Sequence, residues 1–227
     1  MAISAGLFRK VQQWSSYGED EMVYRPFQVD GNPYKAKIFV VGANATPKIE
    51  GDSTSENIFI ESLIIGSLFE ELYGYQFTGQ SREYNGMIQF ASWAKRELGE
   101  HVVLTYVNPL QVDGTDELKR VRNELPDRYE RGFQVFRTII QEFQPKVIVL
   151  QGTQTLQQFR EQFQEQLIDQ FENIHKVQEL EEHGVFAQLH MSDGQEPIAV
   201  LACRSMSYFG KDGASFAALK EQLQLFV

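Results

Sequence analysis

The sequence predicts an α/β protein whose helices wrap a mostly parallel β-sheet. Short apolar runs rich in β-branched residues, typical of buried strands, alternate with longer stretches in which apolar residues recur at helical spacing. Each strand and helix together take roughly 30 residues or more, as expected when a helix crosses over between parallel strands. Glycine, asparagine or proline follows the strand-like runs, so the strands are expected to end in loops.

The length and composition favour one globular domain over residues 1–227. A chain of 227 residues can bury a sizeable core, and no stretch reads as a linker between two domains. Residues 1–35 are expected to form an N-terminal helix and a lead-in to the first strand. No segment has the pattern of a signal peptide or the length of a membrane span, so we expect a cytoplasmic protein without a membrane partner.

The charge balance restricts the partners that the surface favours. The chain has 21 Lys and Arg against 31 Asp and Glu, a formal net charge of −10. Such a surface repels polyanions at long range, which disfavours a broad grip on nucleic acid but leaves a local basic groove and a protein partner open. The lone cysteine, Cys203, excludes an internal disulfide and any metal centre built from several cysteines.

Three helices and two strands are predicted in the first half of the chain. Apolar side chains at helical spacing mark the helices, whereas the strands are continuous apolar runs with many β-branched residues. Gly42 ends the first strand, Gly74 stops the second helix and Asn108 follows the second strand. The helices are expected over residues 7–14, 58–73 and 82–98, the strands over 37–41 and 101–107, and an irregular lead-in over 17–33.

The second half of the chain predicts the remaining strands and helices. The segment from Asp113 to Pro126 is expected to hold a short helix, and the next helix stops before Pro145. Ser192, Asp193 and Gly194 predict a hairpin turn between two short strands. The strands are expected over residues 146–150, 184–190 and 197–202, the helices over 132–143, 156–171 and 214–226, and a loop over 203–213.

Three strand ends carry the residues of greatest chemical interest. They are Gly42-Ala43-Asn44-Ala45-Thr46, Tyr106-Val107-Asn108-Pro109 and Ala202-Cys203-Arg204-Ser205. In a parallel sheet these ends open on one edge, where ligands usually bind because the loops there surround a common space. Asn, Ser and Gly are also the default residues of turns, so each junction taken alone favours a structural role.

The order and surroundings of these junctions are similar to those of a known family. Gly42-Ala43-Asn44-Ala45-Thr46 stands where that family has a Gly-Ile-Asn-Pro-Gly loop, and Asn57-Ile58-Phe59-Ile60 stands for its Asn-x-Phe-Trp entry into a helix. On these motifs the chain resembles the uracil-DNA glycosylase superfamily, nearest its mismatch-specific and thymine-DNA glycosylase branch. The resemblance runs from about Lys37 to the C-terminus with divergent motifs. It implies a three-layer α/β/α fold with a central, mostly parallel sheet of four strands.

The resemblance also implies hydrolysis of the N-glycosidic bond of a damaged or deaminated base in DNA, with neither metal nor organic cofactor. Cleavage puts positive charge on the sugar and negative charge on the leaving base, so the site needs a held water and donors toward the base. Asn44 matches the residue that positions the water, and the backbone N–H groups of Gly42 and Ala43 are candidate donors. The base is flipped out of its stack against an aromatic face, for which Phe59 is the candidate.

The third junction departs from the family. Cys203 stands where the family has a His or Asn that contacts the base, and a thiol is only a weak hydrogen-bond donor. Arg204 is a candidate phosphate contact, and Asn108 and Ser205 complete the expected substrate-binding residues. A second hypothesis is therefore a catalytically inactive protein of this fold that binds a nucleotide, a nucleic acid or a protein partner. The acidic balance and Cys203 favour this second hypothesis, and Asn44 favours the enzyme.

Two other kinds of site have less support in the sequence. A Cys-His nucleophile needs a histidine beside Cys203, and the spacing of the 4 histidines selects none of them. The segment from Glu179 to His183 groups acids with one histidine, a pattern more typical of a solvated helix face than of a metal site.

Overall fold

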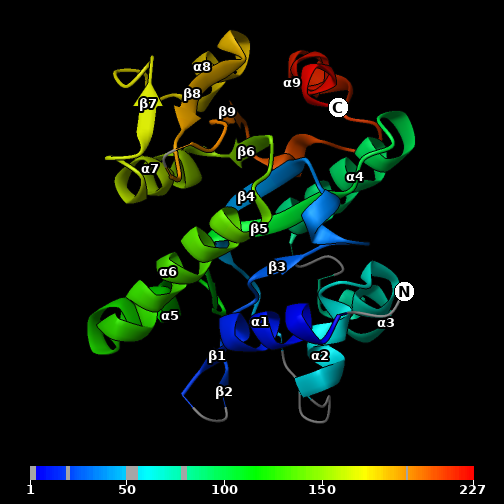
Figure 1. Cartoon of the computed structure of the whole chain (residues 1–227), viewed down its shortest axis with the longest axis vertical. Coiled ribbons are helices and arrows are strands. Elements are labelled where there is room, and N and C mark those ends of the chain that lie inside the picture. The colour runs from blue at the N-terminus through cyan, green and yellow to red at the C-terminus, as the bar shows by residue number, and fades with distance from the viewer. Residues whose placement is uncertain (1–3, 19–20, 50–55, 78–80, 193) are drawn as a thin grey trace.

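A seven-stranded mixed sheet forms the centre of the molecule (Figure 1). The computed structural model describes residues 4–18, 21–49, 56–77, 81–192 and 194–227. The strand order is β3-β5-β4-β6-β9-β8-β7, with β5, β4, β6 and β9 parallel and the outer strands antiparallel. The strands are β3 (Phe27–Gln28), β4 (Ile38–Ala45), β5 (Val102–Gln111), β6 (Val147–Gln151), β7 (Leu167–Asp169), β8 (Val185–Leu189) and β9 (Ile198–Cys203).

Strand β4 lies in the middle of the parallel strands and is paired on both sides. Its residues Ile38 to Val41 pair with Val102 to Thr105 of β5 and with Val147 to Leu150 of β6. Every residue of β5 and β6 is buried, which explains why these strands are continuous apolar runs in the sequence. Because the four strands are parallel, their carboxyl ends meet at one edge of the sheet.

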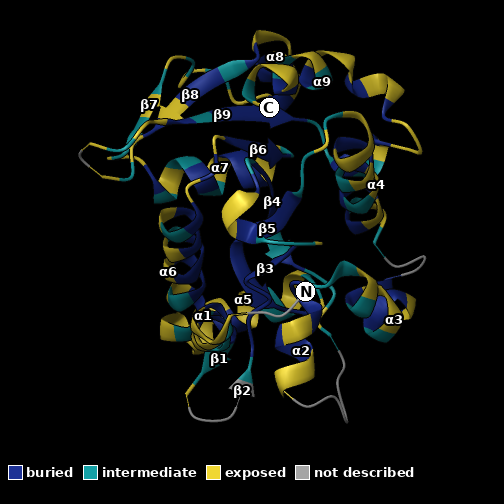
Figure 2. Cartoon of the chain, turned by 45° about the vertical axis from the view of Figure 1, so that its right-hand side comes forward, coloured by how far each residue is buried: buried dark blue, intermediate teal, exposed yellow. Residues whose placement is uncertain are grey.

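Helices cover both faces of the sheet, giving the expected three layers. Phe39 and Val41 face a core with α1, α6 and α7, whereas Ile38 and Val40 face a second core with α4 and α9. Figure 2 shows the buried strands between α6 on one side and α4 on the other. The helices are α1 (Ala5–Ser15), α2 (Glu56–Ser62), α3 (Gly66–Phe77), α4 (Arg82–Glu97), α5 (Thr115–Glu124), α6 (Pro126–Phe143), α7 (Thr153–Gln162), α8 (Val177–His183) and α9 (Ala217–Leu223).

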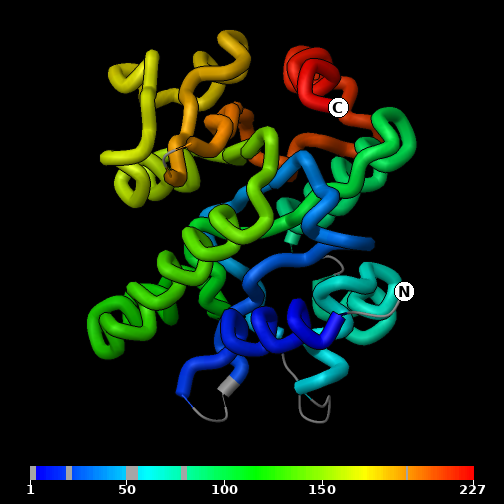
Figure 3. The backbone as a smooth tube through the Cα atoms, in the orientation of Figure 1, coloured from blue at the N-terminus to red at the C-terminus, as the bar shows by residue number. Residues whose placement is uncertain are grey.

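The path of the chain places the N-terminal elements at one end of the sheet and the C-terminal helix at the other (Figure 3). The parallel centre of the sheet confirms the predicted α/β class, but the expected number of four strands is wrong. The missed strands are short: β3 lies in the predicted lead-in, and β7 lies within the stretch expected to continue one helix over 156–171. The lead-in also contains the small hairpin of β1 (Ser16–Tyr17) and β2 (Glu21–Met22). Strands of two or three residues carry no periodicity, so the pattern of the sequence does not reveal them.

Three predicted ends of elements are also wrong. The expected helix over 58–73 is two helices, and Gly74 lies inside α3 rather than after it. Strand β4 continues through Gly42 to Ala45, and β5 continues through Asn108 to Gln111, because the two strands remain paired beyond their apolar runs. The expected turn at 192–194 includes Asp193, which lies outside the described residues, while β8 and β9 form the antiparallel pair expected there.

The helices can be compared with what a membrane span requires. Within the described ranges, none combines the length and the apolarity needed to cross a bilayer.

Gly86 allows α4 to lie against the segment that follows β9. A Cβ atom added at Gly86 would be 1.8 Å from the carbonyl oxygen of Met206, which begins a 3-10 turn over Met206–Tyr208. Two backbones that approach this closely leave no room for a methyl group. The contact fixes the start of α4, and therefore Glu83, relative to the carboxyl end of β9.

We expect Gly86→Ala to lower the free energy of unfolding by about 2 kcal/mol, because the added methyl forces the two backbones apart. Urea denaturation followed by circular dichroism measures the change. Gly6→Ala is the matched control, since Gly6 is also helical and an added Cβ there meets nothing within 4 Å. Equal losses of stability in the two variants would contradict the close approach.

Candidate functional site

The candidate site lies at the carboxyl edge of the parallel strands, between β4 and β6. The pairing of β4 with β6 stops at Val41 and Leu150, whereas its pairing with β5 continues through Asn44 and Asn108. The chain runs outward from β4 to β5 on one side and from β6 to β9 on the other, so the strand order reverses here. Such a reversal opens the crevice in which α/β sheets usually bind ligands.

A cavity of about 400 Å³ lies at this edge, and we call it the Asn44 cavity. Its polar wall includes Asn44, Thr46, Ser81, Glu83, Asp113 and Gln154. The Oδ1 atom of Asn44 is buried and has no hydrogen-bond partner in the described part of the chain. A buried carbonyl oxygen without a partner is rare and costly in proteins. Asn44 lines the cavity, so its side chain brings an unused hydrogen-bond acceptor to this edge of the sheet.

Glu83, in the first turn of α4, brings a carboxyl group to the same cavity. Its Oε1 atom accepts a hydrogen bond of 3.0 Å from Nε2 of Gln151, whose Oε1 in turn accepts one of 2.8 Å from the backbone N–H of Met206. Burial raises the pKa of the Glu83 carboxyl, and hydrogen bonding with Ser205 lowers it in part. A carboxyl with a raised pKa is suited to proton transfer near neutral pH.

Gly42 leaves space for the side chains of Tyr106 and Gln151, which both approach it. A Cβ atom added at Gly42 would lie 3.0 Å from the ring of Tyr106 and 3.2 Å from Nε2 of Gln151. Burial raises the pKa of the Tyr106 hydroxyl, so this group is a neutral donor and acceptor at physiological pH. The glycine that the sequence predicted as the start of a loop is instead a strand residue that leaves space for its neighbours.

Arg25 is a fully buried guanidinium behind the wall of the Asn44 cavity. Its Nη2 atom donates to the Tyr106 hydroxyl at 3.0 Å and to the carbonyl oxygen of Thr46 at 3.3 Å. Its Nη1 atom is buried and has no partner among the residues that the structure describes. Its Cζ atom lies 4.8 Å from the ring centre of Phe77, 5.2 Å from that of Tyr106 and 5.8 Å from that of Tyr84. No carboxylate in the described ranges forms an ion pair with it.

The first two expected junctions reach the edge in different ways. Ala43 and Asn44 line the cavity, although they belong to β4 and not to the expected loop. Asn108 is fully buried: its Nδ2 donates to the carbonyl of Tyr129 at 3.0 Å, and its Oδ1 accepts from the N–H of Leu110 at 3.2 Å. Asn108 therefore ties β5 to α6, with both ends of its amide engaged.

Phe59 lies in the main core rather than on the wall of the Asn44 cavity. It is 6% exposed, and its ring packs edge-on against Tyr73 with 6.2 Å between the ring centres. The structure thus gives Phe59 a packing role and does not bring it together with Asn44. Its position at the start of a helix is consistent with this role.

The third junction is occupied by interactions within the protein. The Cys203 thiol is fully buried, and this burial raises its pKa. Arg204 is held by Glu181, whose Oε2 atom accepts from Nε at 3.0 Å and from the backbone N–H of Arg204 at 3.1 Å. Ser205 caps the following 3-10 turn. The Nε atom of Arg204 is therefore engaged with a buried carboxylate, while its side chain is 40% exposed.

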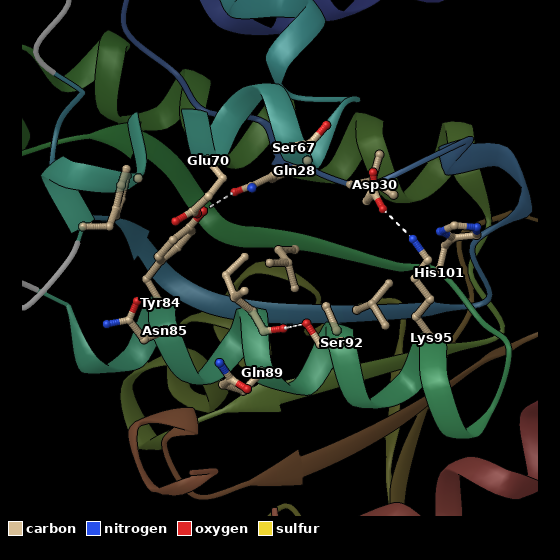
Figure 4. Close-up of a pocket in the computed structure, with 18 of the residues that line it drawn as sticks. Gln28, Asp30, Ser67, Glu70, Tyr84, Asn85, Gln89, Ser92, Lys95 and His101 are labelled. Carbon is tan, nitrogen blue, oxygen red and sulfur yellow. Dashed lines mark hydrogen bonds and ion pairs between the residues drawn. The ribbon is translucent and has the colours of Figure 1, made fainter. Parts of the chain in front are cut away.

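A second cavity, of about 560 Å³, lies between α3 and α4 and opens beside β3 (Figure 4). Two pairs of its polar groups are in contact, with the Tyr84 hydroxyl 2.9 Å from Oε1 of Gln28 and Lys95 Nζ 2.7 Å from Oδ2 of Asp30. Val29, Ile88 and Leu104 contribute apolar surface. None of the site residues expected from the sequence lines it.

The described residues contain no group of three His, Cys, Asp or Glu side chains arranged to hold a metal ion. The segment from Glu179 to His183 belongs to α8, and the His183 ring stacks on Phe171 with 4.5 Å between the ring centres. The helix carries the buried Glu181 that holds Arg204. This segment therefore has a packing role.

Sequence comparison adds no family to this geometry. No protein-family model matches the chain, and a search of curated proteins finds no match either. The residues that sequence reasoning missed are Arg25, Glu83 and Gln151. An arginine between Tyr24 and Pro26, within a run of apolar and aromatic residues, was the available signal for the first of them.

We expect Glu83→Gln to change how stability depends on pH. A carboxyl whose pKa is raised by folding binds more protons in the folded state, so the wild-type protein loses stability as pH rises from the ordinary value of 4.5 toward the raised value. The amide of the variant does not ionise and has no such loss. The difference in unfolding free energy between variant and wild type should therefore grow in favour of the variant from pH 4.5 to pH 8.

Urea titrations at several pH values measure this difference. Glu124→Gln is the control for loss of one negative charge, because Glu124 is exposed at the end of α5. A constant difference between Glu83→Gln and the wild type across the range would show that burial does not perturb this carboxyl.

We expect the Cys203 thiol to be unreactive in the folded protein, because reagents react with the exposed thiolate. A chromogenic disulfide reagent should label less than a tenth of the protein in native buffer and one thiol per chain in denaturant. Rapid native labelling would contradict the burial of Cys203 and would reopen a cysteine nucleophile.

Proposed function

We propose that the protein hydrolyses the N-glycosidic bond of a damaged or deaminated base, with the base bound at the Asn44 cavity. The observation that carries the proposal is the Asn44 side chain, which lines this cavity and has a buried Oδ1 atom without a hydrogen-bond partner among the described residues. A cavity of about 400 Å³ is within the usual range for small-molecule sites. The position of Asn44 at the end of the central strand matches the water-positioning residue implied by the family resemblance.

In this proposal Asn44 orients the attacking water and Glu83 accepts its proton. The Oδ1 atom of Asn44 accepts a hydrogen bond from the water, so that a lone pair of the water oxygen points toward the sugar carbon. An amide is a poor base, and the ionised Glu83 carboxylate accepts the proton that the water loses. The raised pKa of Glu83 supports this role, because a weaker acid has a more basic conjugate carboxylate.

The second candidate function is binding of a nucleobase-containing ligand without hydrolysis. The charged residues known to line the Asn44 cavity are Glu83 and Asp113, both acidic, with no lysine or arginine in the described part of the wall. Arg204 is held by Glu181. Contacts to the phosphates of DNA would have to come from outside this wall, which favours a ligand smaller than a duplex.

We expect Asn44→Ala to reduce the formation of abasic sites by about 100-fold, the usual effect of losing one positioned group in proton transfer and water activation. The assay incubates the protein with single- and double-stranded oligonucleotides that carry uracil, hypoxanthine, xanthine or a thymine mismatch. Alkaline cleavage of the abasic product, resolved on a gel, reports the rate.

Asn123→Ala is the matched control, because Asn123 is exposed on α5. An activity that Asn44→Ala leaves unchanged would exclude the proposed mechanism. Absence of cleavage on every substrate, together with saturable binding of a base or nucleoside, would favour the second candidate.

A further inference from the structure

Arg25 presents an electrostatic problem that the described contacts do not resolve. Its side chain is 1% exposed, so the guanidinium has lost its hydration. A buried charge is normally paired with an opposite charge, because desolvation is costly and aromatic faces compensate only part of it. The Tyr106 hydroxyl and the Thr46 carbonyl are dipoles, and Nη1 has no partner. Within the described ranges, the protein thus holds a positive charge without a counter-ion.

The position of this charge relates it to the Asn44 cavity. Thr46, whose carbonyl oxygen accepts from Arg25, is part of the cavity wall. Tyr106, the other acceptor, lies against Gly42 and beside Gln151, which holds Glu83. The guanidinium is therefore one residue behind the wall of the Asn44 cavity, whereas Phe77 and Tyr84, whose rings it also faces, line the second cavity. A buried charge is screened less by salt and water than a surface charge, so its field extends to a ligand on the far side of Thr46.

We propose that Arg25 is the charge-compensating residue of the Asn44 cavity and selects heterocycles that are bound as ring N–H acids in their anionic form. This inference rests on the proposed binding of a base in the cavity, and it adds a residue outside the part of the chain that carries the family resemblance. Arg25 acts through the wall, so it is a positioning and electrostatic residue and not a catalytic one.

The chemistry of the cleavage balances with this role. The bond between the sugar carbon and the base nitrogen breaks, and its electron pair stays on the base, which leaves as an anion. The water oxygen bonds to the sugar carbon, and the water proton passes to Glu83. Arg25 keeps its proton throughout and offsets the new negative charge. Bases that leave only after gaining a proton receive no such help.

The other titratable groups near Arg25 must be considered in any test against pH. Tyr106 of β5 and Tyr84 of α4 both face it, and burial raises the pKa of both hydroxyls. Glu83 acts on Tyr106 from the start of α4, and Glu70 acts on Tyr84 from α3. Ionisation of Glu83 works against binding of an anion, so its effect has the opposite sign to ionisation of the ligand.

Titration calorimetry with two bases of nearly equal shape tests the inference. Uracil and 5-fluorouracil are the probes, and the ring N–H of the fluorinated base is the more acidic. We expect the wild-type protein to bind 5-fluorouracil about tenfold more tightly as pH rises through its ionisation, with a smaller rise for uracil over the same range. An affinity for 5-fluorouracil that stays level or falls would overturn the inference without any variant.

Three variants separate charge from packing. Arg25→Met should remove the pH-dependent gain for 5-fluorouracil, Arg25→Lys should keep most of it, and Arg9→Met, at an exposed arginine of α1, should behave as wild type. A folded Arg25→Met protein with the full gain would overturn the inference while leaving the proposed hydrolysis intact.

The outcomes also distinguish this inference from the proposed function. Binding with the expected pH dependence but without cleavage of any oligonucleotide supports the role of Arg25 and rejects the hydrolase. Cleavage that proceeds equally well in Arg25→Met rejects the role of Arg25 alone. Failure of the wild-type protein to bind either base rejects the role of Arg25, whereas the oligonucleotide assay alone decides on the hydrolase.

Discussion

The double pairing of β4 is the constraint on which the candidate site depends. Hydrogen bonds to β5 on one side and β6 on the other hold this strand in one register, and a slip of one residue would move Val41 from one core to the other. The same register sets the position of Asn44 at the carboxyl edge of the sheet. Because pairing with β6 stops three residues before Asn44, the strand end is rigid on one side and open on the other.

Polar groups concentrate at this open end, and they are not fully compensated. Within the described ranges, Asn44 Oδ1 and Arg25 Nη1 are buried without partners, and burial raises the pKa of the Glu83 carboxyl. Proteins accept such costs mainly where a ligand or a reaction uses them. By contrast, Asn108 and the Arg204–Glu181 pair have satisfied contacts and stabilise the surroundings.

The parts of the structure that the sequence predicts are those with a repeated local signal. The four parallel strands are apolar runs because both faces of each strand are covered, and the amphipathic pattern locates α4 and α6. The predicted ends of β4 and β5 were wrong because Gly42 and Asn108 are residue types common in turns. In the structure, Gly42 leaves space for the Tyr106 ring, and Asn108 donates a hydrogen bond to the carbonyl of Tyr129. Both reasons are tertiary contacts, which no local pattern contains.

In the candidate site, too, residues with a local signal were predictable, and residues placed by tertiary contacts were not. Asn44 was predictable because it follows closely on the apolar run of β4, and a parallel sheet places such residues at a common edge. Glu83 looked like an ordinary acid in the first turn of a helix, and its burial depends on the close approach of Gly86 to Met206. Arg25 comes from the lead-in, far from Asn44 in the sequence. In the proposed site, Glu83 is a weak acid, Arg25 a cation and Asn44 a neutral amide, so a ligand would be distinguished by its charge as well as by its shape. That selectivity is useful to an enzyme whose leaving group becomes negative, and it is equally useful to a binding protein that must reject neutral bases.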